Sequence, residues 1–180
     1  MSPSRLQAYE SIVMEYIRNY RPYSRKEVIH FQRIKSLSEA IREAANCRMP
    51  NGKKHPHQYR IPVESLNEAR EKLLKLPLSE CPSFDSLHEM VKSEISDIYM
   101  IGELTIYDIA HRIGEFLRRP PDFVYLHRGT TDGAYALGLS GVNGKLKVTD
   151  LPIPFQRLPA HEIEDCLCIF KSKLQEINNV

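Results

Sequence analysis

The stretch from Val124 to Ala134 holds the densest group of side chains that could do acid–base chemistry. His127 can exchange a proton near neutral pH, and Asp132 could orient or activate it. Arg128 could bind a phosphate group. A purely structural connection between two helices would also use polar residues of these types, because they form hydrogen bonds with the free backbone groups at helix ends. We take His127 and Asp132 as candidate catalytic residues and Arg128 as a candidate phosphate contact.

A second candidate site is a basic loop between Ala44 and Val63, a stretch without any acidic residue. Its prolines and its Asn51–Gly52 pair exclude a continuous helix. Cations neutralise phosphates with release of counterions, and an exposed tyrosine can stack on a base. A solvated basic loop without a ligand would have the same composition. The candidate contacts of this loop with nucleic acid are Arg48, Lys53, Lys54, Tyr59 and Arg60.

Residues 98–113 are typical of one helix that ends, a tight turn centred on Gly102, and a second helix that begins at once. A glycine lets the backbone turn tightly, and the following helix presents free N–H groups and the positive end of its dipole. Both features suit a phosphate, which positions a nucleic acid without reading its sequence. The candidate contacts are Ile101, Gly102, Glu103, Leu104 and Thr105.

This stretch resembles the helix-hairpin-helix of DNA-repair proteins, whose turn reads hydrophobic-x-Gly-hydrophobic-Gly with Thr or Ser three residues later. The residues that fit are Ile98, Ile101, Gly102, Thr105 and Ile109. Met100 stands where the first glycine belongs, and Ile106 where a small residue belongs. The resemblance implies contact with the DNA backbone. The alternative is an ordinary helical hairpin whose glycine only ends a helix.

A weaker similarity to helix-hairpin-helix DNA glycosylases extends this resemblance to catalysis. In those enzymes a catalytic aspartate lies about twenty residues beyond the second hairpin glycine, and acts on a flipped-out base. The same count from Gly102 gives Asp122. The family aspartate follows an apolar pair, whereas Asp122 precedes Val124, and a helix start alone explains such an acid. The resemblance implies that Asp122 or Asp132 supplies the catalytic carboxylate and that His127 acts as a proton shuttle.

Composition indicates a folded protein, with 42% hydrophobic and 27% charged residues in a chain of 180. No apolar run is long enough to span a membrane, and no secretory signal precedes the first helix. Four cysteines without CxxC spacing favour reduced thiols in the cytosol. We expect no metal and no cofactor, since His55 and His57 alone are too few ligands. Residues 1–60 have a net charge of +7 and residues 61–180 one of −5, which indicates a face toward an acidic partner.

Hydrophobic spacing predicts a mainly α protein, a single-domain helical bundle with the helix-hairpin-helix and one small β-hairpin near 142–148. We expect a basic helical arm and loop over 1–60 and the helix-hairpin-helix core over 61–180. The expected helices are 6–20, 24–46, 62–75, 83–98, 104–118 and 159–177, with short helices at 121–126 and 130–137.

The sequence therefore predicts a cytosolic protein, free of the membrane, that binds DNA mainly through its sugar–phosphate backbone, in DNA repair, processing or defence. Two alternatives remain open. One is a DNA glycosylase-like enzyme, which release of a base would reveal. The other is a non-enzymatic protein-interaction module with a purely structural hairpin, for which duplex binding would lack strong salt dependence.

Overall fold

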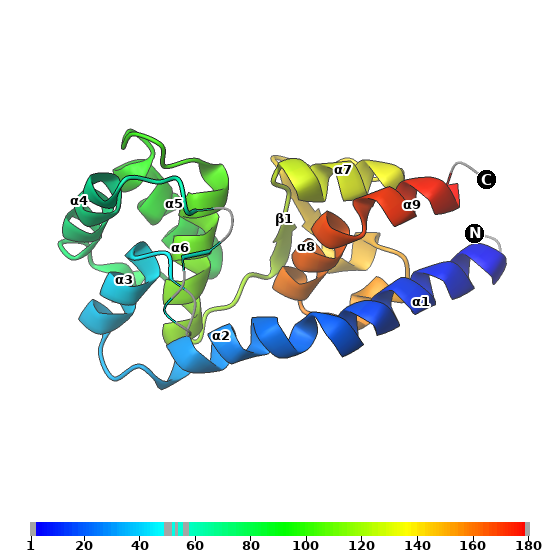
Figure 1. Cartoon of the computed structure of the whole chain (residues 1–180), viewed down its shortest axis with the longest axis horizontal. Helices are drawn as coiled ribbons and strands as arrows, with labels where there is room; N and C mark the ends of the chain where they lie inside the picture. The colour runs from blue at the N-terminus through cyan, green and yellow to red at the C-terminus, as the bar shows by residue number, and fades with distance from the viewer. Residues whose placement is uncertain (1–2, 49–51, 53, 56–57, 179–180) are drawn as a thin grey trace. The chain divides into compact units, whose positions relative to one another are not determined.

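The computed structural model describes residues 3–48, 52, 54–55 and 58–178, and Figure 1 draws their helices and strands. The fold is mainly α-helical with one small antiparallel sheet of two strands, which confirms the fold class expected from hydrophobic spacing. Across these described ranges, no helix is both long and apolar enough to cross a membrane.

The chain forms two compact units. Unit 2 is one continuous segment, Arg25–Pro121, whereas unit 1 combines Met1–Ser24 with Asp122–Val180. Residue 60, at which the charge pattern changes sign, lies inside unit 2 and marks no boundary between the units. The first crossing from one unit to the other falls inside a helix, Arg21–Arg33.

Unit 2 is organised around its last helix. Its helices are α2 (Arg21–Arg33, which begins in unit 1), α3 (Leu37–Ala45), α4 (Val63–Leu73), the short 3₁₀ turn η1 (Leu78–Glu80), α5 (Phe84–Ile95) and α6 (Glu103–Phe116). Helix α6 packs against α5 and α3, and α4 packs against α3 and α5. The hydrophobic side chains of α6 that meet these neighbours, such as Ile109 and Ile113, are fully buried. Burial of this apolar face is what holds a helix of this length in place.

The single helix expected over residues 24–46 is wrong, because the structure has two helices there, α2 and α3. Ser36 begins the second one, since its hydroxyl accepts a hydrogen bond from the backbone N–H of Glu39 at 3.3 Å. The expected start at Ser24 is also wrong, because α2 begins at Arg21. Pro22 lies in the first turn of α2, where the missing N–H of proline has no cost.

The turn between α5 and α6 has its unusual backbone at Met100. Met100 has a φ of 62°, in the left-handed region that favours glycine. Gly102 precedes α6 with an extended φ of −103° and ψ of 173°, and a Cβ added there would meet open space. The position that needs glycine-like freedom is therefore the one at which the helix-hairpin-helix motif has its first glycine, and this chain places a methionine there.

Unit 1 has a core of its own, in which the first helix packs with the last two. Its elements are α1 (Pro3–Asn19), β1 (Phe123–Tyr125), α7 (Arg128–Ala136), β2 (Lys145–Lys147), η2 (Val148–Asp150), η3 (Phe155–Arg157), α8 (Ala160–Ile169) and α9 (Lys171–Asn178). Helix α7 packs on α8 and α9, and α8 also contacts β1. Fully buried Val13, Tyr16 and Phe155 belong to this core.

The short helix expected at 121–126 is wrong, because Phe123–Tyr125 is strand β1. It pairs antiparallel with β2, with Val124 opposite Leu146. The tight turn expected at Asn143–Gly144 is present, with positive φ values of 52° and 72° and a bridge between Val142 and Lys145. The conformation of residues 123–125 depends on the pairing of β1 with β2, and the local sequence does not predict that pairing.

The single helix expected over residues 159–177 is wrong, because the structure has two helices there, α8 and α9, with Phe170 between them. The glycines of α7 face α8 at very short range. A Cβ added to Gly129 would lie 2.6 Å from the sulfur of Cys168, and one added to Gly133 would collide with the carbonyl oxygen of Leu167. These two glycines therefore set how closely α7 approaches α8.

Candidate nucleic-acid interface

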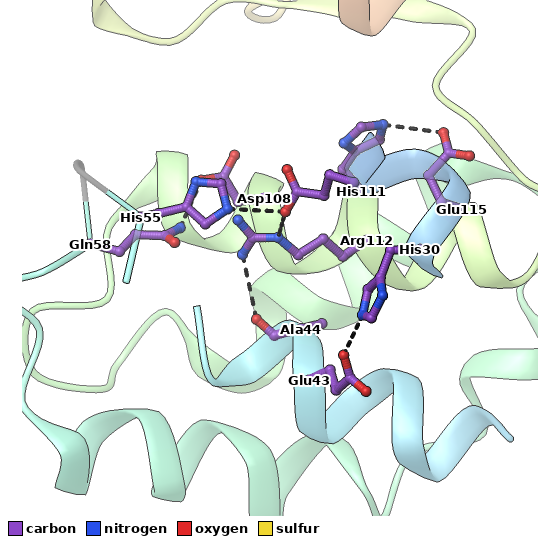
Figure 2. A network of polar contacts seen from close by, with 10 residues as sticks. His30, Glu43, Ala44, His55, Gln58, Asp108, His111, Arg112 and Glu115 are labelled. Atoms are coloured by element: carbon purple, nitrogen blue, oxygen red, sulfur yellow. Dashed lines mark hydrogen bonds and ion pairs between the residues drawn. The ribbon is translucent and has the colours of Figure 1, made fainter. Parts of the chain in front are cut away.

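A partly buried ion-pair network joins the basic loop of unit 2 to its helices (Figure 2). The Glu27 carboxylate of α2 accepts a hydrogen bond from Nε of Arg112 on α6 at 2.7 Å. The same carboxylate oxygen lies 3.0 Å from Nε2 of His55, in the loop. Arg112 also donates to the carbonyl oxygen of Ala44 at the end of α3, at 3.5 Å. One arginine thus joins α2, α3 and α6 to the loop.

The charges of Glu27 and Arg112 stabilise each other. Burial alone would raise the pKa of Glu27, but the hydrogen bond from His55 and the positive charge of Arg112 outweigh it and lower that pKa to about 2. Burial lowers the pKa of the Arg112 guanidinium, but the carboxylates of Glu27 and Asp108 outweigh this effect and raise that pKa above its usual value. Removal of either partner would leave the charge of the other without compensation, which would destabilise the fold.

A second buried contact ties the loop to α6. Gln58 is fully buried, and its side-chain Nε2 donates to Oδ2 of Asp108 at 2.7 Å. Burial raises the pKa of Asp108, against the lowering effect of the Arg112 charge. The amide oxygen of Gln58 is also buried and has no hydrogen-bond partner among the residues that the structure describes.

Figure 2 also shows two histidine–carboxylate contacts that brace the helices around this network. Nε2 of His111 lies 3.2 Å from the carboxylate of Glu115 on the same helix. Gln32 of α2 donates to that carboxylate at 2.8 Å, so the pair also joins α2 to α6. His30 of α2 lies 2.5 Å from Glu43 of α3.

The loop itself is closed by backbone bonds. Arg48 and Lys54 form an isolated antiparallel bridge, and the N–H of His55 donates to the carbonyl of Cys47 at 3.0 Å. Arg48 caps the turn by a bond from Nη1 to the carbonyl of Gly52 at 2.7 Å. Lys54 donates to the carbonyl of Ile61 at 3.1 Å, so its charge is partly used within the loop. Lys53 lies outside the described residues.

Tyr59 and Arg60 are the exposed part of the loop next to α6. Their neighbours Gln58 and Ile61 are buried, and the N–H of Ile61 donates to the carbonyl of Gln58 at 3.2 Å across them. The Tyr59 side chain is 57% exposed. The structure thus brings together four of the five predicted loop residues on one anchored segment: Arg48, Lys54, Tyr59 and Arg60.

The predicted contacts at the start of α6 have mixed surroundings. Gly102 and Glu103 are exposed, Leu104 is half-buried, and Ile101 and Thr105 are buried. The N-cap residue is Gly102, which has no side chain to cap the helix, so the first N–H groups of α6 can serve a ligand. However, the Glu103 carboxylate lies there, 3.0 Å from Nζ of Lys92. That carboxylate already complements the helix dipole, which lowers the attraction of the helix start for an anion.

The candidate catalytic residues belong to unit 1. Asp122 is exposed just before β1, and His127 precedes the first residue of α7, exposed Arg128. The carboxylate of Asp132 lies 3.6 Å from Nζ of Lys171, with both side chains close to half exposed. Deeper in this unit, Thr130 donates to the buried carboxylate of Glu164 at 2.7 Å, which supports the start of α7.

Sequence reasoning missed the network below the loop: Glu27, His55, Gln58, Asp108 and Arg112. One signal for it was available. Arg112 stands between Ile109 and Ile113 on the apolar face of α6, where a charged residue requires a buried partner. Asp108, four residues earlier, could be paired with it by helical spacing.

Comparisons of the chain with protein-family models, with curated proteins and with solved structures found no match.

Proposed function

We propose that unit 2 binds DNA through its sugar–phosphate backbone, with the basic loop of residues 47–61 as the main contact. The observation that carries this proposal is the anchorage of the loop: Gln58 binds Asp108, and His55 shares Glu27 with Arg112. Binding requires that side chains be ordered, and residues already held on the helices, such as His55 and Gln58, lose less conformational entropy when the loop meets a ligand.

The charge of this segment supports the same conclusion. Arg48 and Arg60 are exposed. Residues 44–63 contain no acid, so no carboxylate of this segment neutralises them. Each arginine can give paired N–H donors to a phosphate. Such contacts depend strongly on salt and are independent of base sequence.

The start of α6 is the second contact in this proposal, and the weaker one. It leads to Asp108, which lies six residues after Gly102 and therefore about 9 Å along the helix axis. Gln58 holds the loop at Asp108, on the same helix that begins at the hairpin. The Lys92–Glu103 pair makes the hairpin a poorer phosphate site than the loop.

This contact suits DNA repair, processing or defence, in which proteins hold DNA irrespective of sequence. A cytosolic location fits the four cysteines, all of which are free thiols. Release of a base by Asp122, His127 or Asp132 stays a prediction, since their surroundings favour no particular reaction.

The test is duplex binding by fluorescence anisotropy over a range of salt concentrations. The Arg48→Gln/Arg60→Gln variant should lower the slope of log affinity against log salt by about two, roughly one for each lost phosphate contact. Lys75→Ala is the matched control, because Lys75 is an exposed cation beyond the far end of α4. A slope identical in the loop variant and the wild type would refute the proposal.

A further inference from the structure

The basic loop presents an aromatic ring to solvent, that of Tyr59, which is 57% exposed. Tyr59 and Arg60 occupy the two central positions of a turn, between buried Gln58 and buried Ile61. The turn is closed by the bond from the N–H of Ile61 to the carbonyl of Gln58. The Tyr59 ring therefore extends into solvent from a turn whose two ends are buried.

Arg60 is coupled to that ring. Its guanidinium carbon lies 5.2 Å from the centre of the Tyr59 ring, and its Nε donates to the Tyr59 hydroxyl at 2.7 Å. These two contacts favour the orientation of the ring in which it meets the guanidinium. Since Nε makes this bond, the two Nη groups of Arg60 can donate to a phosphate.

An aromatic ring beside a phosphate-binding arginine is the combination that suits one nucleotide with a free base face. Bases inside a duplex are already stacked on both sides and offer no such face to a ring on a surface loop. Unpaired bases do, and stacking on an aromatic side chain tolerates any base. Lys54 and Arg48 lie earlier on the same loop, where they could bind phosphates of the strand on one side of that nucleotide.

We infer that the ligand of the loop is single-stranded DNA, with one unpaired base stacked on Tyr59 and an adjacent phosphate bound by Arg60. This inference rests on the proposed function and narrows its substrate class from DNA in general to strands with unpaired nucleotides.

The experiment compares the full chain and its variants on a single-stranded DNA oligonucleotide and on the duplex of the same sequence. Tyr59→Ala removes the ring, whereas Tyr59→Phe keeps the ring and loses only the hydroxyl. Tyr135→Ala is the matched control, because Tyr135 of unit 1 is 64% exposed. Anisotropy gives the affinity, and 2-aminopurine placed in the strand reports stacking through quenching of its emission.

We expect Tyr59→Ala to weaken single-strand binding by at least about fivefold, the lower limit for loss of one stacked base, and to change duplex binding less than about twofold. Tyr59→Phe and Tyr135→Ala should leave single-strand affinity unchanged. Quenching should persist in Tyr59→Phe and vanish in Tyr59→Ala.

Two other outcomes separate the inference from the function on which it rests. Salt-dependent binding of both DNA forms, with equal effects of Tyr59→Ala on each, would overturn the inference and leave the proposed function standing. Absence of salt-dependent binding to either form would overturn both.

Discussion

Gln58 and Asp108, fifty positions apart in the sequence, are joined by a hydrogen bond of 2.7 Å between a fully buried amide and a carboxylate in the middle of α6. This bond fixes the end of the basic loop next to Tyr59 and Arg60. The position of the exposed pair therefore depends on a contact that is itself withdrawn from solvent.

Gln58→Ala should destabilise unit 2 by about 1–3 kcal/mol, because the Asp108 carboxylate would remain buried without its donor. Hydrogen exchange of the backbone amides over residues 54–61 should accelerate, since the loop loses one of its two anchors. The matched control is Gln7→Ala, which removes an exposed glutamine of α1. Unchanged exchange in the loop would contradict the anchoring role of Gln58.

Glu27→Gln should lower stability most at neutral pH. The folded-state pKa of Glu27 is about 2, below its ordinary value near 4.5, so the carboxylate stabilises the fold above pH 4.5 and loses this contribution as pH falls toward 2. The wild type should exceed the variant by about 2–3 kcal/mol at pH 7, with the gap closing between about pH 5 and pH 2.

Urea unfolding at a series of pH values measures this gap. Glu89→Gln replaces a carboxylate that is 66% exposed and serves as the control, with a change within about 0.5 kcal/mol. A gap between wild type and Glu27→Gln that stays constant across the acid range would show that the Glu27 pKa is not depressed.

Arg112→Leu should cost about 3–5 kcal/mol, because it leaves the charge of Glu27 without its buried partner. The double variant Arg112→Leu/Glu27→Leu should recover part of this loss, since the unpaired charge of Glu27 is removed as well. Chemical denaturation of the wild type, both single variants and the double variant gives the coupling free energy. Strict additivity of the two substitutions would mean that the pair is not coupled.

The turn before α6 should respond differently at its two special positions. Met100→Gly should stabilise the protein by about 0.5–1 kcal/mol, because glycine adopts a φ of 62° without a steric cost. Gly102→Ala should change stability by less than about 0.5 kcal/mol, since its φ is extended and its Cβ would have room. Thermal unfolding measures both variants. A large loss on Gly102→Ala would place the strained position at Gly102 instead.

Helices with a clear apolar stripe could be predicted from the sequence. The spacing of Leu66, Ala69 and Leu73 predicts α4, and the capping serine and apolar face of α5 predict its start at Ser83. These signals act within a few residues, so no knowledge of distant partners is needed. The same local reasoning predicts the tight turn at Asn143–Gly144.

Features that depend on distant partners could not be predicted in this way. Phe123–Tyr125 is a strand only because Lys145–Lys147 pairs with it, and the network around Arg112 combines residues from α2, the loop and α6. The break between α2 and α3 has a local signal, Ser36, but the apolar spacing continues across it and favours one helix. In the folded protein the cap at Ser36 prevails over this spacing, and a new helix begins there.

The division of unit 1 between the two ends of the chain sets an order of events during synthesis. All of unit 2 has been translated before Asp122, so its helices can assemble while the second half of unit 1 is still absent. Until then the apolar face of α1 lacks α8, α9 and η3, against which it packs in the described structure. A prefolded unit 2 shortens the effective loop that joins the two halves of unit 1, which lowers the entropic cost of bringing them together.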